Sequence, residues 1–284
     1  MEPGQRLATV AFYSEKFDLG RGTIQSALNY LEEQGAVQLE RRGHLGTQIT
    51  AIDYKKLWLN GGARSVTGVM PLPYSRRYEG LATGLYQVFR TAGLPFNLAY
   101  MRGSSNRIES LKRQQYDFAV ISKLAAEENS SEVEPVIEFG PQSYVSGHRV
   151  LFASGDETQI RDGMRVGIDN SSADHVVLTK TECAGHNVEL VEMPYSQVIR
   201  SLLTRRIDAA IWNVDEVIER GYPITYCNLS SKEACHLDDR GTVAVVVVRR
   251  NNRAISNLLR TVIDVDKVLE LQRLVLDEKL LPNY

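Results

Sequence analysis

Two hydrophobic patterns divide the chain. Residues 1–52 carry apolar positions at helical spacing, first Leu7, Val10, Tyr13 and Phe17 and then Ile24, Ala27, Leu28 and Leu31. From residue 64 onward, short β-rich runs alternate with segments of helical length. These runs are 65–69, 96–101, 118–121, 150–153, 165–168, 188–192, 209–212 and 242–248. Such alternation predicts α/β units built on a largely parallel sheet.

The boundaries between these patterns predict the domain organisation. Residues 53–62 break the pattern and end in Gly61-Gly62, so we place a linker there. The α/β part then covers 63–284. Its last segment, 251–281, has helical spacing and is expected to pack back on the first half of this part, after the strand at 242–248 crosses over.

The α/β part contains an internal repeat. IESLKRQQYDFAVIS (108–122) aligns with IRSLLTRRIDAAIWN (199–213), which sets Asp117 opposite Asp208 as polar turn residues with a structural role. A strand–helix–strand stretch precedes each copy. We therefore expect two lobes, lobe I at about 63–148 and 243–284 and lobe II at about 149–242. Any two αβ units also look alike at this level, and that alternative stays open here.

The first 52 residues predict a DNA-binding motif. A helix ends near Phe17, Asp18-Leu19-Gly20 forms a turn, and a second helix runs from about Arg21 to Gln34. Two helices joined by a short turn make a helix-turn-helix. Residues 36–40 and 47–52 flank RRGHLG and predict a small β-hairpin, or wing.

The stretch FDLGRGTIQSALNYLEEQGAVQLERRGHLGT (17–47) resembles the winged helix-turn-helix of the GntR family of bacterial transcription regulators. The likeness covers about residues 4–50. The whole chain is similar to the YhfZ family, whose C-terminal part resembles the type 2 periplasmic-binding-protein fold used as an effector sensor. This resemblance implies an α/β protein, with an N-terminal winged helix-turn-helix followed by a two-lobed, periplasmic-binding-protein-like domain.

The resemblance also implies DNA-contacting residues on the second helix. Arg21 and Thr23 lie where the family's recognition helix starts against the DNA. Gln25 replaces a frequent arginine there, and its amide can read adenine. Gly20 stands where a serine usually caps this helix, and the family's helix before the Pro-Gly pair has no counterpart before Pro3-Gly4.

The wing carries the other implied contacts. Arg41 and Arg42 open the wing and would meet phosphates. His44 at the wing tip either contacts the minor groove or is an exposed turn residue. Residues 1–56 contain seven basic and seven acidic side chains, so few phosphates are neutralised by one copy. We therefore expect a homodimer on a two-fold symmetric site in double-stranded DNA.

Three loops after predicted strands are rich in Ser, Gly and Asn, namely PLPYSRR, MRGSSNR and IDNSSAD. Ser and Asn cap helix N-termini, whose N–H groups also hold anions. The loops meet in one cleft if the two lobes face each other. The expected ligand-binding residues are Tyr74, Ser75, Ser104, Ser105, Arg107, Asn170, Ser171, Ser172, Trp212 and Asn213. Capping alone also explains the loops, and Trp212 is nearly as well explained as a core residue.

Composition excludes several other classes. The chain has 284 residues, 43% of them hydrophobic, and a net charge of −2, which are ordinary globular values. No run is apolar enough for a membrane span, and the N-terminus lacks a signal-peptide layout. Three cysteines are too few for a disulfide framework, so we expect reduced thiols in a cytoplasmic protein.

No motif for catalysis or metal binding emerges. Gly-x-Ser-x-Gly, P-loop and His-Glu-x-x-His patterns are absent from the sequence, and Cys227 with Cys235-His236 lacks zinc-ligand spacing. We expect no cofactor, no metal and no catalytic residues. The leading hypothesis is a DNA-binding transcription regulator that senses a small, anionic metabolite. The alternatives are an enzyme with a vestigial reader domain and a dimerising DNA-binding protein without a ligand.

Overall fold

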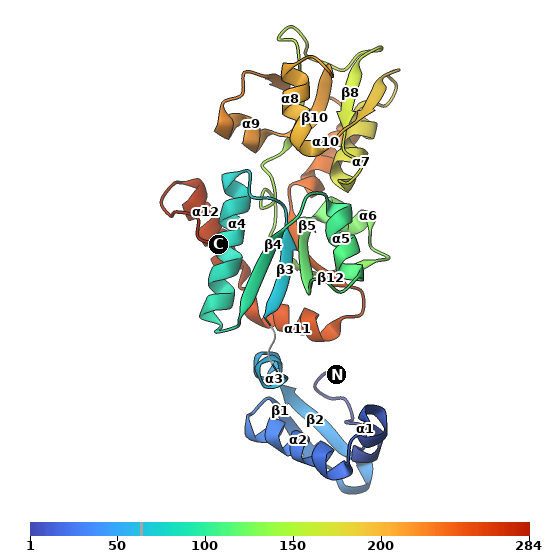
Figure 1. The fold of residues 1–284 in the computed structure, drawn as a ribbon, viewed down its shortest axis with the longest axis vertical. Coiled ribbons are helices and arrows are strands. Elements are labelled where there is room, and N and C mark those ends of the chain that lie inside the picture. The colour runs from blue at the N-terminus through green and yellow to red at the C-terminus, as the bar shows by residue number, and fades with distance from the viewer. Residues whose placement is uncertain (63–64) are drawn as a thin grey trace.

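Three parts follow one another along the longest axis of the molecule (Figure 1). The computed structural model describes residues 1–62 and 65–284, so the expected start of lobe I at residue 63 lies outside the described residues. The N-terminal part lies at one end, and two α/β units follow it. No helix of the described chain is long and apolar enough to cross a bilayer.

The N-terminal part is a winged helix-turn-helix, as predicted. Helices α1 (Val10–Phe17) and α2 (Arg21–Glu33) precede strands β1 (Val37–Arg41) and β2 (Thr47–Ile52), which pair antiparallel around the short 3-10 helix η1 (Gly43–Leu45). The Thr9 side chain caps α1 by accepting from the backbone N–H of Phe12 at 3.1 Å, and Asp18 ends it in the left-handed region at φ 53°. Gly20 starts α2 without a side-chain cap, as expected from its missing side chain.

The apolar face of this part is only partly covered. Among residues 1–62, only Ile24, Ala36 and Ile49 are buried hydrophobics. An apolar groove of about 320 Å³ remains between α1, α2 and the wing. Most stabilisation of a helix comes from tertiary packing of its apolar face, so this part gains little of it.

The predicted linker at 53–62 is largely helical. Asp53 caps α3 (Tyr54–Asn60) by accepting from the backbone N–H of Lys56 at 2.9 Å. Tyr54 and Trp58 of α3 pack against the core of the α/β part, where α3 contacts helix α11 (Arg253–Val262). The segment expected to be a linker thus contains a helix, and these two aromatic residues pack it against the α/β part.

The α/β part contains two five-stranded sheets. The first has the order β4-β3-β5-β12-β6 and the second the order β9-β8-β10-β7-β11. The strands of the first are β3 (Val66–Met70), β4 (Phe96–Tyr100), β5 (Phe118–Ser122), β6 (Val133–Glu138) and β12 (Ala244–Arg249). Those of the second are β7 (His148–Phe152), β8 (Arg165–Ile168), β9 (Glu189–Glu192), β10 (Ala209–Asn213) and β11 (Thr225–Cys227).

Both sheets are mixed rather than largely parallel. In each sheet the three strands listed first pair parallel, and the last two pair antiparallel. One strand of each sheet runs against its neighbours, namely β7, where the chain enters the second sheet, and β12, where it returns to the first. The sequence pattern also missed the edge strands β6, which contains Pro135, and β11, which has only three residues.

The internal repeat is confirmed by matching hydrogen bonds. Asp117 accepts from the backbone N–H of Thr67 at 2.9 Å and returns its own N–H to the Thr67 carbonyl at 2.8 Å. Asp208 makes the same pair with the backbone of Arg165, both at 2.8 Å. Each aspartate thus ties the start of one strand to the start of its parallel neighbour, which is the structural role expected for it.

Helices cover both sheets. Around the first lie α4 (Arg76–Thr91), α5 (Ser104–Lys112), α6 (Lys123–Glu128), α11 and α12 (Val265–Leu276), and around the second α7 (Ala173–Glu182), α8 (Val198–Leu203), α9 (Val214–Arg220) and α10 (Lys232–Gly241), with the 3-10 helix η2 (Tyr195–Gln197) before α8. As predicted, the C-terminal helical segment packs on the first α/β unit, with α12 along α4. A Cβ at Gly84 would meet the Val268 backbone at 2.9 Å, so this contact needs glycine.

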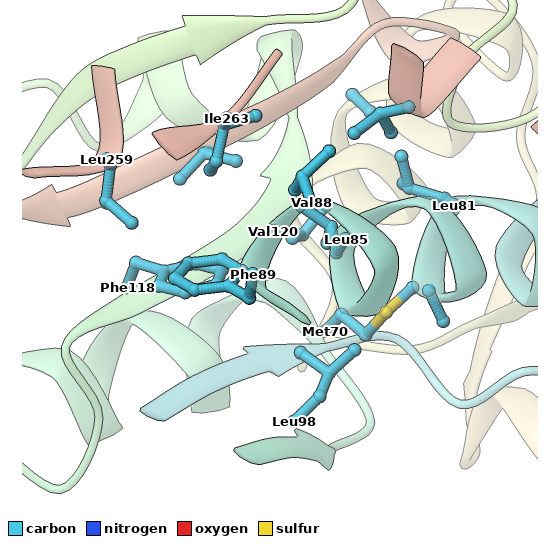
Figure 2. Close-up of a cluster of buried hydrophobic side chains, with 14 of the residues drawn as sticks. Met70, Leu81, Leu85, Val88, Phe89, Leu98, Phe118, Val120, Leu259 and Ile263 are labelled. Atoms are coloured by element: carbon cyan, nitrogen blue, oxygen red, sulfur yellow. The ribbon is translucent and has the colours of Figure 1, made fainter. Parts of the chain in front are cut away.

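The largest apolar cluster joins the first sheet to these helices. Phe89 of α4 lies beside Phe118 of β5 with nearly parallel rings, and Leu259 and Ile263 close the cluster from the C-terminal segment (Figure 2). The first sheet therefore depends on residues from both ends of the α/β part. This fixes the carboxyl ends of β3, β4 and β5 toward the second sheet.

Candidate functional site

A cavity of about 50 Å³ lies between the two sheets. Its lining comes from loops after β3, β4, β8 and β9, from the end of β10, and from the segment that connects the sheets. Carboxyl ends of parallel strands are the usual place for ligands in open α/β folds. The cavity is therefore the candidate ligand site, and it lies where the sequence places the cleft.

Half of the expected ligand residues reach this cavity. Tyr74, Ser104, Arg107, Ser172 and Asn213 line it. The remaining five do not line it, and local interactions explain each of them.

Four of these five residues lie in the loops beside the cavity. Ser75 caps α4 and is buried. Ser105 and Asn170 are exposed. Ser171 directs its hydroxyl to Asp169 at 2.6 Å, and so completes a turn rather than facing a ligand.

Trp212, the fifth, is a core residue. It is 1% exposed, and the ring of Tyr195 stacks on it at 3.5 Å between centroids. Tyr195 lines the cavity and separates Trp212 from it. The core alternative for Trp212 thus describes its place, and Tyr195 is the aromatic residue that meets the cavity.

The two α/β units contact each other directly at the cavity rim. The Ser104 hydroxyl accepts from the backbone N–H of Ala173 at 3.0 Å, so a serine of one unit caps helix α7 of the other. The N–H of Ser105 donates to the Ser171 carbonyl at 3.1 Å. Gly103 permits this approach, because a Cβ there would lie 2.5 Å from the Ser171 carbonyl oxygen. The structure therefore describes a closed arrangement.

Arg107 is the most unusual residue of the site. Its side chain is buried, and it donates to the Met101 carbonyl at 2.7 Å and to the Tyr144 hydroxyl at 2.9 Å. Its Nε has no acceptor. A buried cation is costly without a counter-charge, so Arg107 is not the solvated surface charge that a lone arginine usually is.

Two aspartates from the IDNSSAD loop also line the cavity. Asp169 accepts from the Ser171 N–H at 2.9 Å and from the Tyr195 N–H at 2.6 Å. Burial raises the pKa of Asp169, but these hydrogen bonds outweigh it and hold the pKa below its usual value. Asp174 is deeply buried, accepts from the Ser122 hydroxyl, and has a raised pKa because of burial.

His148 lies where the chain passes from the first sheet to the second. Its Nδ1 is 2.6 Å from Oδ1 of Asp238, and its backbone N–H donates to Oδ2 at 3.0 Å. Burial lowers the pKa of His148, but the charge of Asp238 outweighs burial and leaves the pKa raised. His148 thus lines the cavity and has its partner, Asp238, within the protein.

His175 is held neutral between two backbone groups. Its Nδ1 accepts from the Asp169 N–H and its Nε2 donates to the Ile211 carbonyl, both at 2.8 Å. Burial lowers its pKa to about 4. The ring thus fixes the loop after β8 to the neighbouring strand β10.

This lowered pKa predicts a pH dependence of stability. A depressed histidine pKa contributes stability above the usual value near 6.5 and loses it as the pH falls toward about 4. The wild-type protein should therefore lose more free energy of unfolding between about pH 7 and about pH 4.5 than His175→Gln, which keeps an amide donor and acceptor. Urea unfolding at several pH values measures this, and equal pH dependence in the two proteins would contradict the assignment.

Several site residues were beyond the reach of sequence patterns. Tyr78, Tyr144 and Tyr195 reach the cavity from a helix face, the connecting segment and the start of η2. No local motif marks these tyrosines. Asp169 and Asp174 had a signal, since both lie in a loop already selected for its serines.

The predicted DNA-contacting residues are all exposed, as DNA contact requires. Arg21 and Thr23 lie in the first turn of α2, and Gln25 donates to Asn29 on the same helix at 2.9 Å. These three positions lie at the N-terminal end of α2, on the surface of the protein.

The wing residues are exposed but partly engaged within the protein. Arg41 pairs with Glu32 at 2.5 Å and Arg42 with Glu40 at 2.7 Å, while His44 lies exposed in η1. Exposed ion pairs are weak, so both arginines can exchange their partners for phosphates.

The domain composition identifies the family. A family described as the YhfZ C-terminal domain matches residues 53–284, and one described as a helix-turn-helix domain matches residues 2–49. The YhfZ protein of Escherichia coli (strain K12) is 36% identical over 288 residues, covering 99% of this chain and 92% of that protein. The chain belongs to the YhfZ family.

Solved structures agree with this YhfZ assignment. The crystal structure of YhfZ from Shigella flexneri matches with a TM-score of 0.67 and 34% identity, over 82% of this chain and 98% of that one. An arginine-specific periplasmic binding protein of Salmonella typhimurium matches with a TM-score of 0.57 and 13% identity, over 74% and 98% of the two chains.

A further match is an amino acid transporter substrate-binding protein of Streptococcus pneumoniae bound to L-arginine. It has a TM-score of 0.55 and 16% identity, over 77% of this chain and 95% of that one. At such identities the two binding proteins show the fold alone. The fold is thus an N-terminal helix-turn-helix joined to a periplasmic-binding-protein-like domain. In a YhfZ protein this combination indicates a DNA-binding regulator.

Proposed function

We propose that this protein is a cytoplasmic, homodimeric transcription regulator whose two-lobed domain, at about 63–284, senses a small anionic metabolite. The winged helix-turn-helix at residues 1–52 binds a two-fold symmetric operator through Arg21, Thr23, Gln25, Arg41, Arg42 and His44. The observation that carries the proposal is the buried, unneutralised Arg107 in the cavity between the sheets. A cation in that position favours binding of an anion from solution.

A physical connection from the cavity to the reader domain supports regulation. The first sheet continues from β12 into α11, and α11 contacts α3 next to the wing. The ion pair between Arg253 of α11 and Glu2, at 3.5 Å, adds a second contact. An effector that binds one closure state of the two lobes better than the other would shift the position of α11, and with it the reader domain.

One observation favours a second function, a DNA-binding protein without a ligand. The cleft is largely filled by its own side chains, with Tyr74 and Tyr195 stacked across it at 5.8 Å, and only about 50 Å³ remains. Under this alternative the α/β part would serve dimerisation alone. It leaves the buried charge of Arg107 unexplained, so we favour the sensor.

Selection of random duplex DNA by the full chain at two salt concentrations tests the reader domain. We expect a two-fold symmetric motif to be enriched, and Arg21→Ala to lose the enrichment or weaken it by about tenfold, because a charge-assisted contact is removed. Arg260→Ala makes the same change at an exposed arginine of α11. This variant is the control and should select the same motif. Absence of any enriched motif in the wild-type protein would contradict DNA recognition.

A further inference from the structure

Two buried donors, on residues that line the cavity, have no acceptor. They are Nε of Arg107 and Nδ2 of Asn213, on side chains that are 3% and 1% exposed. Asn213 uses its other amide atom, since Oδ1 accepts from the Asp215 N–H at 2.9 Å and so fixes the direction of the amide. Leaving a buried donor unpaired costs about 1–3 kcal/mol, so two in one small cavity indicate a missing acceptor.

The missing acceptor carries negative charge. The two terminal nitrogens of Arg107 bond only to neutral oxygens, those of Met101 and Tyr144. Within residues 1–62 and 65–284, no carboxylate forms an ion pair with Arg107. An anion bound between Arg107 and Asn213 would satisfy both donors and the charge together.

Of the two aspartates that line the cavity, one has donors of the protein on both oxygens. Asp169 accepts from the Ser171 N–H and hydroxyl on one oxygen and from the Tyr195 N–H on the other. Asp174 accepts from the Ser122 hydroxyl on Oδ1 alone, and the charges of His148 and Arg107 act on it. A ligand ammonium group would therefore find one aspartate oxygen, Oδ2 of Asp174, and the charge of Arg107 would oppose it there.

The charge and the size of the cavity limit which anions can bind. Arg107 supplies one positive charge, which can balance the single charge of a monoanion. Asp169 and Asp174 add negative charge nearby, so a dianion such as phosphate would be repelled. The volume of about 50 Å³ holds roughly four water-sized groups. Pro71, Leu72, Met101 and Val145 supply an apolar wall for a short carbon chain.

We propose that the cavity binds a small monocarboxylate without an α-ammonium group, with its carboxylate between Arg107 and Asn213. This rests on the proposed function, because it assigns the ligand class of the same effector site. It also separates this chain from the amino acid-binding proteins that share its fold, since an ammonium group here would meet the charge of Arg107 with a single aspartate oxygen to accept from it.

Calorimetric titration of the full chain with acetate, propionate, glycine, alanine and inorganic phosphate tests the ligand class. We expect propionate or acetate to bind at least tenfold more tightly than the amino acid of matching carbon chain, and more tightly than phosphate. Equal or tighter binding of glycine or alanine would overturn the proposal, as would preference for phosphate. Absence of binding by every probe would also overturn it.

An isosteric variant reverses the expected preference. Asn213→Asp keeps the oxygen that accepts from the Asp215 N–H and replaces the free donor Nδ2 with an acceptor. Propionate affinity should fall by roughly tenfold to a hundredfold, since a hydrogen bond to a charged group becomes a repulsion. Alanine affinity relative to propionate should rise, and an unchanged preference in the folded variant would contradict the assigned geometry.

The DNA selection separates the two levels of the proposal. If the protein selects a motif and that selection changes with alanine rather than propionate, the proposed regulatory function is supported and the proposed ligand class is wrong. If the protein binds propionate at Arg107 and selects no DNA, the proposed ligand class is supported and the proposed regulatory function is wrong.

Discussion

Arg107→Met should remove small-anion binding while leaving the ligand-free protein about as stable as the wild type. The change deletes a buried charge without an ion pair, which offsets the loss of the bonds to Met101 and Tyr144. Affinity for a bound carboxylate should fall by about tenfold to a hundredfold, because a charge-assisted hydrogen bond contributes about 1.5–3 kcal/mol. Calorimetry with propionate and thermal unfolding measure the two effects.

Arg107→Lys is the matched control for this result. Lysine keeps the charge but lacks the planar fork that bonds Met101 and Tyr144 at once, so we expect intermediate affinity. Full affinity in Arg107→Met would show that the anion binds elsewhere. A large loss of stability in the same variant would show that Arg107 is a structural residue.

The largest expected loss of stability follows from Trp212→Ala. Trp212 is buried in the apolar core of the second sheet beneath Tyr195, and its truncation leaves a large cavity. Substitutions of this kind cost about 3–5 kcal/mol. Urea unfolding measures the loss, and Trp212→Phe, which keeps an aromatic ring, should lose less. A ligand-stacking tryptophan would instead lose affinity with unchanged stability.

The pattern of apolar and polar residues predicted most helices and strands, because neighbouring residues in the sequence decide their structure. The inner strands β3, β5, β8 and β10 read as short apolar runs, since both of their faces are covered. Strands β6 and β11 lie at sheet edges, where Pro135 and short length hide the pattern. Helix α3 was missed because its packing against α11, nearly 200 positions later, decides its structure.

The candidate site was half predictable for a similar reason. Ser104, Arg107 and Ser172 follow strands, and strand ends converge in any open α/β fold. Tyr144 and Tyr195 enter through the connecting segment and η2, and only the tertiary fold brings them to Arg107. Trp212 was considered for the cavity because β10 ends there, but its side chain packs in the core beneath Tyr195, as the alternative had it.

Two arginines near the cavity differ in whether they form an ion pair within the protein. Arg77, close to the same cleft, bonds to Asp215 at 3.2 Å and so has its counter-charge within the protein. Arg107 forms no ion pair with a carboxylate among the described residues, although both arginines lie near the ends of neighbouring strands. This difference in partners selects Arg107 as the anion-binding residue.

In the proposed regulator, a ligand bound in the cavity changes the affinity for DNA. The most direct test is the affinity of the full chain for its selected duplex, measured by fluorescence anisotropy with and without saturating propionate. We expect a change of about fivefold or more in either direction in the wild-type protein, within the usual range of allosteric coupling, and no change in Arg107→Met. Identical DNA affinity with and without bound propionate in the wild-type protein would contradict the account.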